Sequence, residues 1–324
     1  MNIEVIVQNN NDGKIYDISD LIQDIEVDTE IEETPGKLTF DFIHINPNIQ
    51  YISEGSPISL KVDNNNVFWG YVFKIGKKKG KVSLTAYDQL RYFKNKDTYV
   101  FSNLSCEGIF TKICKDRQIQ YKVINGCNHI LPERINDNKT FAEMIQYSFD
   151  KTLIDIGKWY FMRDNFGTLE MLEVSKQQTN LAIGDESLLI DYDYESSIDD
   201  DTYNQVKLVK ENKETKKREI YIVKDSSNIK KWGLLQLYET VDEKANEAQI
   251  KEKAEQLLKH HNKPKRTLKL DCLGDFRVKV GCGVYLIIKD LENDIPYKKD
   301  VIVTKVTHSF KNCSHKMNLE VKIV

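Results

Sequence analysis

The feature that most constrains this chain is an internal repeat of alternating apolar residues. A glycine opens each copy, at Gly55 and at Gly281, and apolar residues follow at the same spacing. The matching positions are Ile58, Leu60, Val62, Val72, Ile75, Val82, Leu84 and Ala86 in the first copy, and Val284, Leu286, Ile288, Val303, Val306, Met317, Leu319 and Val321 in the second. Because successive side chains of a strand point to opposite faces, each copy predicts a three-stranded meander with one apolar face.

Two explanations of this match remain open. Any two meanders of alternating residues resemble each other, so the match can arise without a common origin. The alternative is a duplicated barrel, in which loops lengthened while the strands kept their order. A chain with two like domains can build a ring of six like positions from three copies, and closed cyclic rings are ordinary oligomer symmetry.

Short strands also precede and surround the first copy. Turn formers separate them, at Pro35-Gly36, at Asn64–Asn66 and between Gly76 and Gly80. Several short strands at this spacing are typical of a sandwich or a barrel. The predicted strands are 3–7, 37–43, 58–62, 67–75 and 81–87.

The middle of the chain changes to a helical period. Ser105 is a predicted N-cap, and the apolar positions of 141–153 recur at intervals of three and four, which predicts a helix over 140–156. A hairpin signal follows, with strands at 159–162 and 169–172 around the turn Asp164–Gly167. These elements predict a small α+β domain.

The strand character returns after residue 183 and is interrupted by one helix. Predicted strands lie at 188–194, 204–210, 219–223, 284–288, 301–306 and 316–323. Thr240 with Glu243 predicts a capping box for the helix, and Pro264 marks its end. The predicted fold is therefore mainly β with α+β: antiparallel, tube-like β-barrel domains at 1–97 and 181–324 flank a middle domain at 98–180, and the last has an inserted helix near 241–262.

Composition excludes several classes of protein. The 324 residues carry a net charge of −3, whereas a bulk nucleic-acid binder is usually strongly basic, so no sequence-specific nucleic-acid partner is expected. No apolar run reaches the ~18 residues that span a membrane, and the first residues lack a signal-peptide pattern. The chain is therefore expected to be made in the cytoplasm and to leave it only within an assembly. Its six scattered cysteines are expected to be reduced.

Motifs for catalysis, cofactors or metals are absent from the sequence. No nucleophile elbow, Walker loop or dinucleotide fingerprint is present, so no catalytic residue and no cofactor is expected. Cys313 with His315 and Cys127 with His129 give only two ligands each, and zinc needs about four, so no metal site is expected either. The basic run Lys77–Lys81 is expected to be a solvated turn or a contact with an acidic neighbour.

Two groups of residues are candidates for contact or transport. Asp191, Asp193 and Glu195 alternate, so they are expected to share one strand face and could line a channel; a solvated edge, a glycosidase or a calcium site are the alternatives. Trp69 and Tyr71 share a strand face opposite to that of Phe68. Because Trp and Tyr are favoured in interface cores, Trp69 and Tyr71 are the candidate subunit contact, with a carbohydrate platform as the lesser alternative.

Other segments resemble a known family. Gly70-Tyr71-Val72, the run Leu84–Tyr92 (LTAYDQLRY) and the turn Phe161–Leu169 (FMRDNFGTL) are similar to tail hub proteins of contractile-tailed, defective prophages of Gram-positive bacteria, within the wider late-control-D group. The order barrel, α+β middle, barrel also agrees. The resemblance covers essentially the whole chain, and the segment near Tyr87 is its most specific part.

This resemblance implies a non-enzymatic, homotrimeric baseplate hub. In such hubs the two barrels form a pseudo-six-fold ring with the tail tube on one face and a trimeric spike on the other. Wedge and peptidoglycan-binding tail proteins are the implied neighbours, and no membrane anchor is implied. The same part serves phages and phage-tail-like bacteriocins. The alternatives are a cell-wall or carbohydrate-binding tail module, and a peptidoglycan hydrolase that uses Asp191 or Asp193.

Overall fold

The computed structural model describes residues 1–10, 13–31, 34–43, 52–199, 201–212, 217–241, 246–296 and 299–323. The chain divides into two compact units. Unit 1 comprises Met1–Asp193 and Leu268–Val324, and unit 2 comprises Tyr194–Thr267. Among the described residues, no helix has both the length and the apolar content needed to cross a bilayer.

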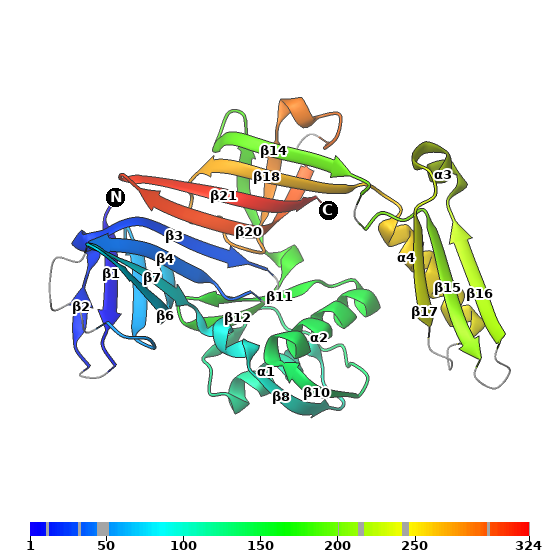
Figure 1. The fold of residues 1–324 in the computed structure, drawn as a ribbon, viewed down its shortest axis with the longest axis horizontal. Coiled ribbons are helices and arrows are strands. Elements are labelled where there is room, and N and C mark those ends of the chain that lie inside the picture. Colours follow the sequence, from blue (N-terminus) through cyan, green and yellow to red (C-terminus); the bar gives the residue numbers. More distant parts are fainter. Residues whose placement is uncertain are drawn as a thin grey trace. The chain divides into compact units, whose positions relative to one another are not determined.

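Unit 1 is organised around one large sheet of thirteen described strands. Its order is β14-β18-β21-β20-β3-β4-β7-β6-β5-β1-β2, while β19 lies between β13 and β20. Figure 1 labels most of these strands, among them β20 and β3. The strands are β1 (Ile3–Gln8), β2 (Ile15–Asp17), β3 (Ile22–Glu30), β4 (Lys37–Ile43), β5 (Pro57–Val62), β6 (Asn65–Lys78), β7 (Lys81–Tyr87), β13 (Gln178–Gly184), β14 (Leu189–Ser197), β18 (Lys265–Leu273), β19 (Gly283–Ile287), β20 (Lys299–Lys311) and β21 (Ser314–Ile323).

The prediction of a mainly β fold is confirmed, and the two predicted β regions join in this sheet. β20 pairs antiparallel with β3, from Lys305 opposite Glu30 to Phe310 opposite Ile25. No closed barrel is found among the described strands, so the pair of separate barrels stays a prediction. The predicted domain boundaries at 97/98 and 180/181 both fall inside unit 1.

The internal repeat extends to the pairing of individual residues. Strands β5-β6-β7 and β19-β20-β21 follow the same antiparallel order. Pro57 opposite Tyr71 corresponds to Gly283 opposite Ile302, and each pair of β6 with β7 has its counterpart in β20 with β21. β4 flanks the first copy as β18 flanks the second, and β3 and β14 follow outside them. The neighbours on the other side differ, because β1 is antiparallel to β5 whereas β13 is parallel to β19.

A shared irregularity makes chance similarity an insufficient explanation. Both copies have a register shift at the same point, between Val72 and Lys74 in one and between Val303 and Lys305 in the other. The amides of Gly55 and Gly281 donate to the carbonyls of those valines at 2.7 and 2.8 Å. Since a bulge is specific to its position in a fold, the match indicates a true duplication.

The middle region of unit 1 packs two helices against short sheets, as predicted. The helices are α1 (Cys106–Asp116) and α2 (Phe141–Ile156), and the strands are β8 (Lys96–Phe101), β9 (Tyr121–Val123), β10 (Arg134–Thr140), β11 (Tyr160–Asn165) and β12 (Thr168–Glu173). Buried aromatic and aliphatic side chains from both helices and the β11–β12 hairpin form one core. Ser105 caps α1, and Thr140 caps α2 with Glu143 in a reciprocal capping box.

Removing the Thr140 hydroxyl tests this cap. The hydroxyl oxygen accepts a hydrogen bond from the Glu143 amide at 3.0 Å. We expect Thr140→Ala to lower the free energy of unfolding by about 1 kcal/mol, as for other N-caps. Urea denaturation measures the loss. Thr140→Ser keeps the oxygen and serves as the control; equal losses in both variants would show that the cap is not responsible.

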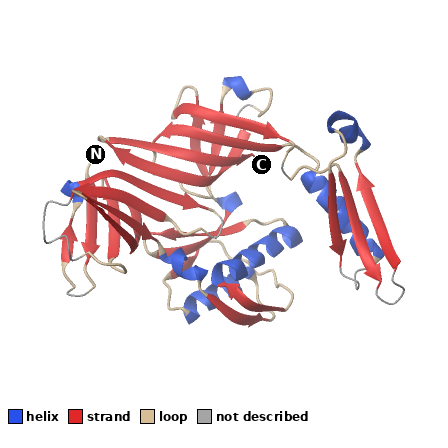
Figure 2. Ribbon diagram, viewed as in Figure 1, coloured by secondary structure: helices blue, strands red, loops and turns tan. Residues whose placement is uncertain are grey.

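Unit 2 is a three-stranded sheet with two described helices. β15 (Gln205–Asn212) lies between β16 (Lys217–Lys224) and β17 (Gln236–Val241), α3 (Ser226–Trp232) joins β16 to β17, and α4 is Glu247–His261 (Figure 2). Ile250 and Ala254 of α4 pack on Val206 and Leu208 of the sheet. The predicted helix near 241–262 is thus present, but its predicted cap is wrong. Thr240 belongs to β17, and the capping box is Asn246 with Gln249, because the strand continues to Val241.

Candidate functional surfaces

The segment Tyr87–Tyr92, which carries the family resemblance, joins the first repeat to the middle region. Asp88 is buried, and its carboxylate accepts hydrogen bonds from the amides of Gly36 at 2.8 Å and Leu90 at 2.9 Å. Burial raises the pKa of Asp88 well above its usual value, and the nearby Asp164 raises it further. There is no room beside Gly36, where a methyl group would overlap the Asp88 carboxylate. Asp88 is therefore a structural group that ties β4 to the short helix Gln89–Lys94.

Gln89 continues this connection into the β11–β12 hairpin. Its amide nitrogen donates to the Gly167 carbonyl at 2.5 Å and to the Asp164 carboxylate at 3.1 Å. Asp164 in turn accepts from the Gly167 amide at 2.8 Å, which closes the hairpin turn. The predicted turn is confirmed, and its role is to anchor the middle region on the first repeat.

Trp69 and Tyr71 lie on the face of β6 opposite to that of the buried Phe68, and both are half-buried. Their rings meet edge to face with centroids 5.0 Å apart, and Tyr71 meets Tyr92 in the same way at 5.5 Å. The backbone of Gly167 packs on the Trp69 indole, since a methyl group there would lie 3.0 Å from the ring. Both side chains thus have contacts within the chain, and their role in subunit contact stays a prediction.

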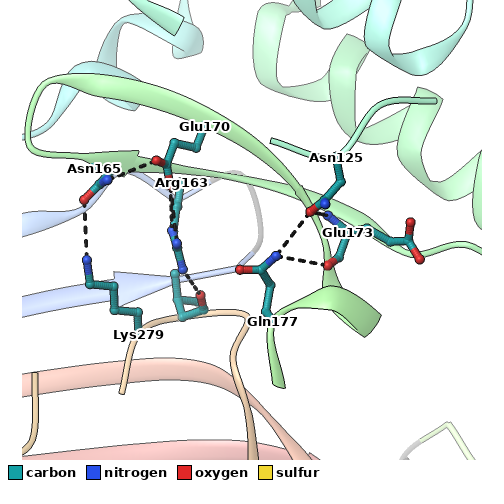
Figure 3. A network of polar contacts seen from close by, with 8 residues as sticks. Asn125, Arg163, Asn165, Glu170, Glu173, Gln177 and Lys279 are labelled. Carbon is teal, nitrogen blue, oxygen red and sulfur yellow. Dashed lines mark hydrogen bonds and ion pairs between the residues drawn. The ribbon is translucent and has the colours of Figure 1, made fainter. Parts of the chain in front are cut away.

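A polar network on the other side of the hairpin reaches the second repeat (Figure 3). Arg163 donates two hydrogen bonds to Glu170 at 3.3 Å and one to the Val280 carbonyl at 3.4 Å. Asn165 donates to Glu170 at 3.0 Å and accepts from Lys279 at 3.4 Å. Because Arg163 and Glu170 are both largely buried, this ion pair is shielded from solvent.

Aromatic packing supports the same contact. The Phe161 ring lies directly against the backbone of Gly281, whose φ is +81°, and a methyl group there would overlap the ring. Phe161 shares a buried cluster with Leu172, Val174 and Val280. The one hairpin therefore contacts both repeats, at Gly167 through Trp69 and at Phe161 through Gly281.

The acidic candidates lie along β14. Asp191, Asp193 and Glu195 are exposed and alternate with the half-buried Tyr192 and Tyr194, so they share one face of the strand as predicted. The first two belong to unit 1, and Glu195 belongs to the part of the strand assigned to unit 2. Their role as channel lining stays a prediction.

The basic run Lys77–Lys81 lies at the β6–β7 turn, as predicted, with Gly80 at a φ of +75°. Lys81 pairs with Asp41 at 2.7 Å, while Lys77, Lys78 and Lys79 are exposed. This leaves a positively charged end on the β6–β7 hairpin.

The two weak metal candidates are not brought together with further ligands. His315 lies in a ring cluster with His308, Phe276 and Phe310, where burial lowers the pKa of His308 to about 4. His129 pairs with Asp155 at 3.0 Å. Within the described ranges, no three His, Cys, Asp or Glu side chains gather in a group that could hold a metal ion.

The model of the YqbQ-like family matches residues 25–322, which is most of the chain. The chain belongs to the YqbQ-like family. A curated relative, the phage-like element PBSX protein XkdQ of Bacillus subtilis, is 29% identical over 273 residues and is matched over 83% of this chain and 82% of its own length. The resemblance to prophage tail proteins that the sequence suggested is thereby confirmed.

Solved structures share the fold of this YqbQ-like chain. The 43 kDa tail protein of prophage MuSo2 from Shewanella oneidensis superimposes with a TM-score of 0.71 at 13% identity, covering 98% of this chain and 97% of that one. The E. coli c3393 protein, a type VI secretion component described as similar to the T4 tail proteins gp27 and gp5, gives 0.56 at 9% identity over 94% and 73%. At these identities the likeness concerns the fold.

Sequence reasoning about this YqbQ-like chain missed the residues that hold the hairpin between the repeats. Gln89, Arg163, Glu170 and Lys279 meet only in the folded chain. The available signal was the charged pair Arg163 and Glu170, seven residues apart across a predicted two-strand turn, where opposite positions are neighbours.

Proposed function

We propose that this chain is a structural hub subunit in the baseplate of a contractile tail. Three copies form a ring with pseudo-six-fold symmetry, which joins the tail tube to a trimeric spike. The particle is a phage or a phage-tail-like element, assembled from protein made in the bacterial cytoplasm. Wedge and peptidoglycan-binding tail proteins surround the hub, and the role requires no active site.

The observation that carries this proposal is the register-matched duplication. Two like groups of strands in one chain allow a three-fold assembly to present six like positions. A tube of six-fold symmetry and a spike of three-fold symmetry both fit such a ring. The XkdQ relative, named as part of a phage-like element, and the fold shared with the MuSo2 tail protein support the tail assignment.

Within this proposal the chain has three parts. The regions 1–97 and 181–324 supply the ring, the region 98–180 braces them, and α4 belongs to an insertion in the second. Asp191, Asp193 and Glu195 face the channel, where their charge repels a polyanion that passes through. Trp69 and Tyr71 stiffen the contact between β6 and the hairpin, and their exposed edges face a neighbouring subunit.

Quantitative mass spectrometry of intact particles purified from the producing cell tests the proposal. We expect about three copies of this chain per particle, which is half the number of tube subunits in one six-fold layer. The tube and spike proteins in the same sample provide the internal standards. Absence of the chain from particles would overturn the hub role, and binding to isolated cell walls instead would favour a wall-binding module.

A further inference from the structure

Among the described residues, β6 and β14 each have an unpaired edge in the large sheet, as do the end strands β2 and β13. The outer part of β6, residues 74–78, pairs with β7 on one side, while β5 covers only residues 65–71 on the other. β14 is an end strand of the sheet, and among the described strands it pairs with β18 alone. An exposed strand edge presents unpaired amides and carbonyls, so it either needs protection or is a site for pairing.

Each of the edges of β6 and β14 has a counterpart in the other repeat. These two counterparts, on β20 and β3, pair with each other inside the chain. β20 corresponds to β6, and β3 corresponds to β14 by its place in the sheet order. The outer part of β20, residues 305–310, forms the antiparallel contact with β3 inside the chain. The chain therefore contains one complete junction between repeats and the two unlike halves of a second.

The charges of the two outer strands match as well. β3 and β14 each have nine residues and carry acids at the same three positions, Asp24, Glu26 and Asp28 in β3 and Asp191, Asp193 and Glu195 in β14. At the internal junction, Lys311 of β20 pairs with Asp24 at 3.1 Å, and Thr307 donates to Asp28 at 2.7 Å. The β3 acids thus serve as partners for β20.

On β6 the corresponding stretch is basic. Lys74, Lys77 and Lys78 are exposed. In the described part of the chain none of these three lysines, and neither Asp191 nor Asp193, lies in an ion pair. One free edge is positive and the other negative, so like edges repel while unlike edges attract.

We propose that β6 of one subunit pairs antiparallel with β14 of a second subunit of the same protein, in the register of the β20–β3 junction. In that register Ser309 corresponds to Lys78 and Glu26 to Asp193, so Lys78 lies opposite Asp193. The contact is heterologous because it joins unlike surfaces of two subunits. Repeated from subunit to subunit, it closes a ring when the rotations between neighbours add up to one full turn. This inference rests on the proposed hub function and specifies its subunit interface.

Cysteine cross-linking in assembled particles tests the register. The double variant Lys78→Cys, Asp193→Cys is made in a Cys313→Ser background, because Cys313 is the exposed cysteine of the six. Opposite residues of antiparallel strands have Cα atoms about 4.5–5.5 Å apart, within the range for a disulfide. We expect most of the chain to migrate as covalent dimers and trimers without reductant. The control is Lys77→Cys, Asp193→Cys, where residue 77 points to the opposite face, and it stays monomeric.

Equal cross-linking of both pairs, or none in particles that contain the chain, would overturn the inference and leave the hub function standing. Absence of the unaltered chain from particles would contradict both the hub function and the proposed pairing. Charge exchange gives a second measurement that does not depend on disulfide formation. Lys78→Glu and Asp193→Lys each are expected to reduce incorporation roughly tenfold, which corresponds to about 1.4 kcal/mol. The combined variant is expected to restore it; single variants with unchanged incorporation, or a combination no better than either, would contradict the pairing.

Discussion

Replacing Gly281 with alanine is expected to lower the free energy of unfolding of unit 1 by about 3–5 kcal/mol, the sum of a strained backbone and an overpacked core. The residue has a φ of +81°, which an L side chain rarely adopts. Its new methyl group would also lie 2.0 Å from Cζ of Phe161, so the ring has to move. Phe161 is buried within its cluster and has little space to move into.

Gly55 provides the matched control, because it occupies the equivalent turn of the first repeat. Its φ is +83°, but among the described residues a methyl group there would meet only the end of the Asn10 side chain, at 3.3 Å. We therefore expect Gly55→Ala to cost about 1–2 kcal/mol, the backbone term alone. Chemical denaturation of both variants measures the difference. Equal losses would mean that Phe161 does not restrict Gly281.

Replacing Asp88 with alanine is expected to cost about 2–4 kcal/mol, because two buried amides lose their acceptor and each unsatisfied group costs about 1–3 kcal/mol. The amides are those of Gly36 and Leu90. The loss is expected to loosen the contact between the first repeat and the middle region first. Hydrogen exchange of the two amides measures this locally, and a variant in which they stay protected would contradict the assignment.

The pH dependence of Asp88→Asn checks the charge state. The folded pKa of Asp88 is raised above its unfolded value by burial and by Asp164, so the folded protein holds the proton more tightly than the unfolded chain. Its contribution to stability is therefore fully present below about pH 4 and is lost as the pH rises through the folded pKa. We expect the asparagine variant to be most destabilised relative to the natural protein at low pH, with the difference shrinking toward neutral pH. A difference that grows with pH would contradict this.

The parts of the fold that follow from local pattern were predictable. The cap of α1 at Ser105 and the β11–β12 turn depend on a few adjacent residues, and both formed as expected. β3 and β18 were missed, although Ile25 and Val27 in one and Leu268 and Leu270 in the other alternate with charged residues. The high charge of these strands concealed an ordinary two-residue period.

The connections between distant segments were not predictable from one sequence. The β20–β3 pairing joins residues almost three hundred positions apart, and no local signal selects β3 over another free edge. The same holds for Phe161 against Gly281. The repeat itself was visible, but only the shared bulge after Val72 and Val303 separates duplication from coincidence.

The place where unit 2 enters the chain has a consequence for how relatives can vary. The chain leaves the large sheet after β14, forms unit 2, and returns to the sheet at β18, the neighbour of β14. The equivalent connection in the first repeat is the short link from β3 to β4. Because the sheet already holds the two ends of the inserted segment together, a longer insertion adds little to the entropic cost of loop closure, about 0.6 kcal/mol for each doubling of its length. We therefore expect the connection between β14 and β18 to tolerate insertions of very different size, in relatives and in engineered variants, while the strands of the large sheet keep their register.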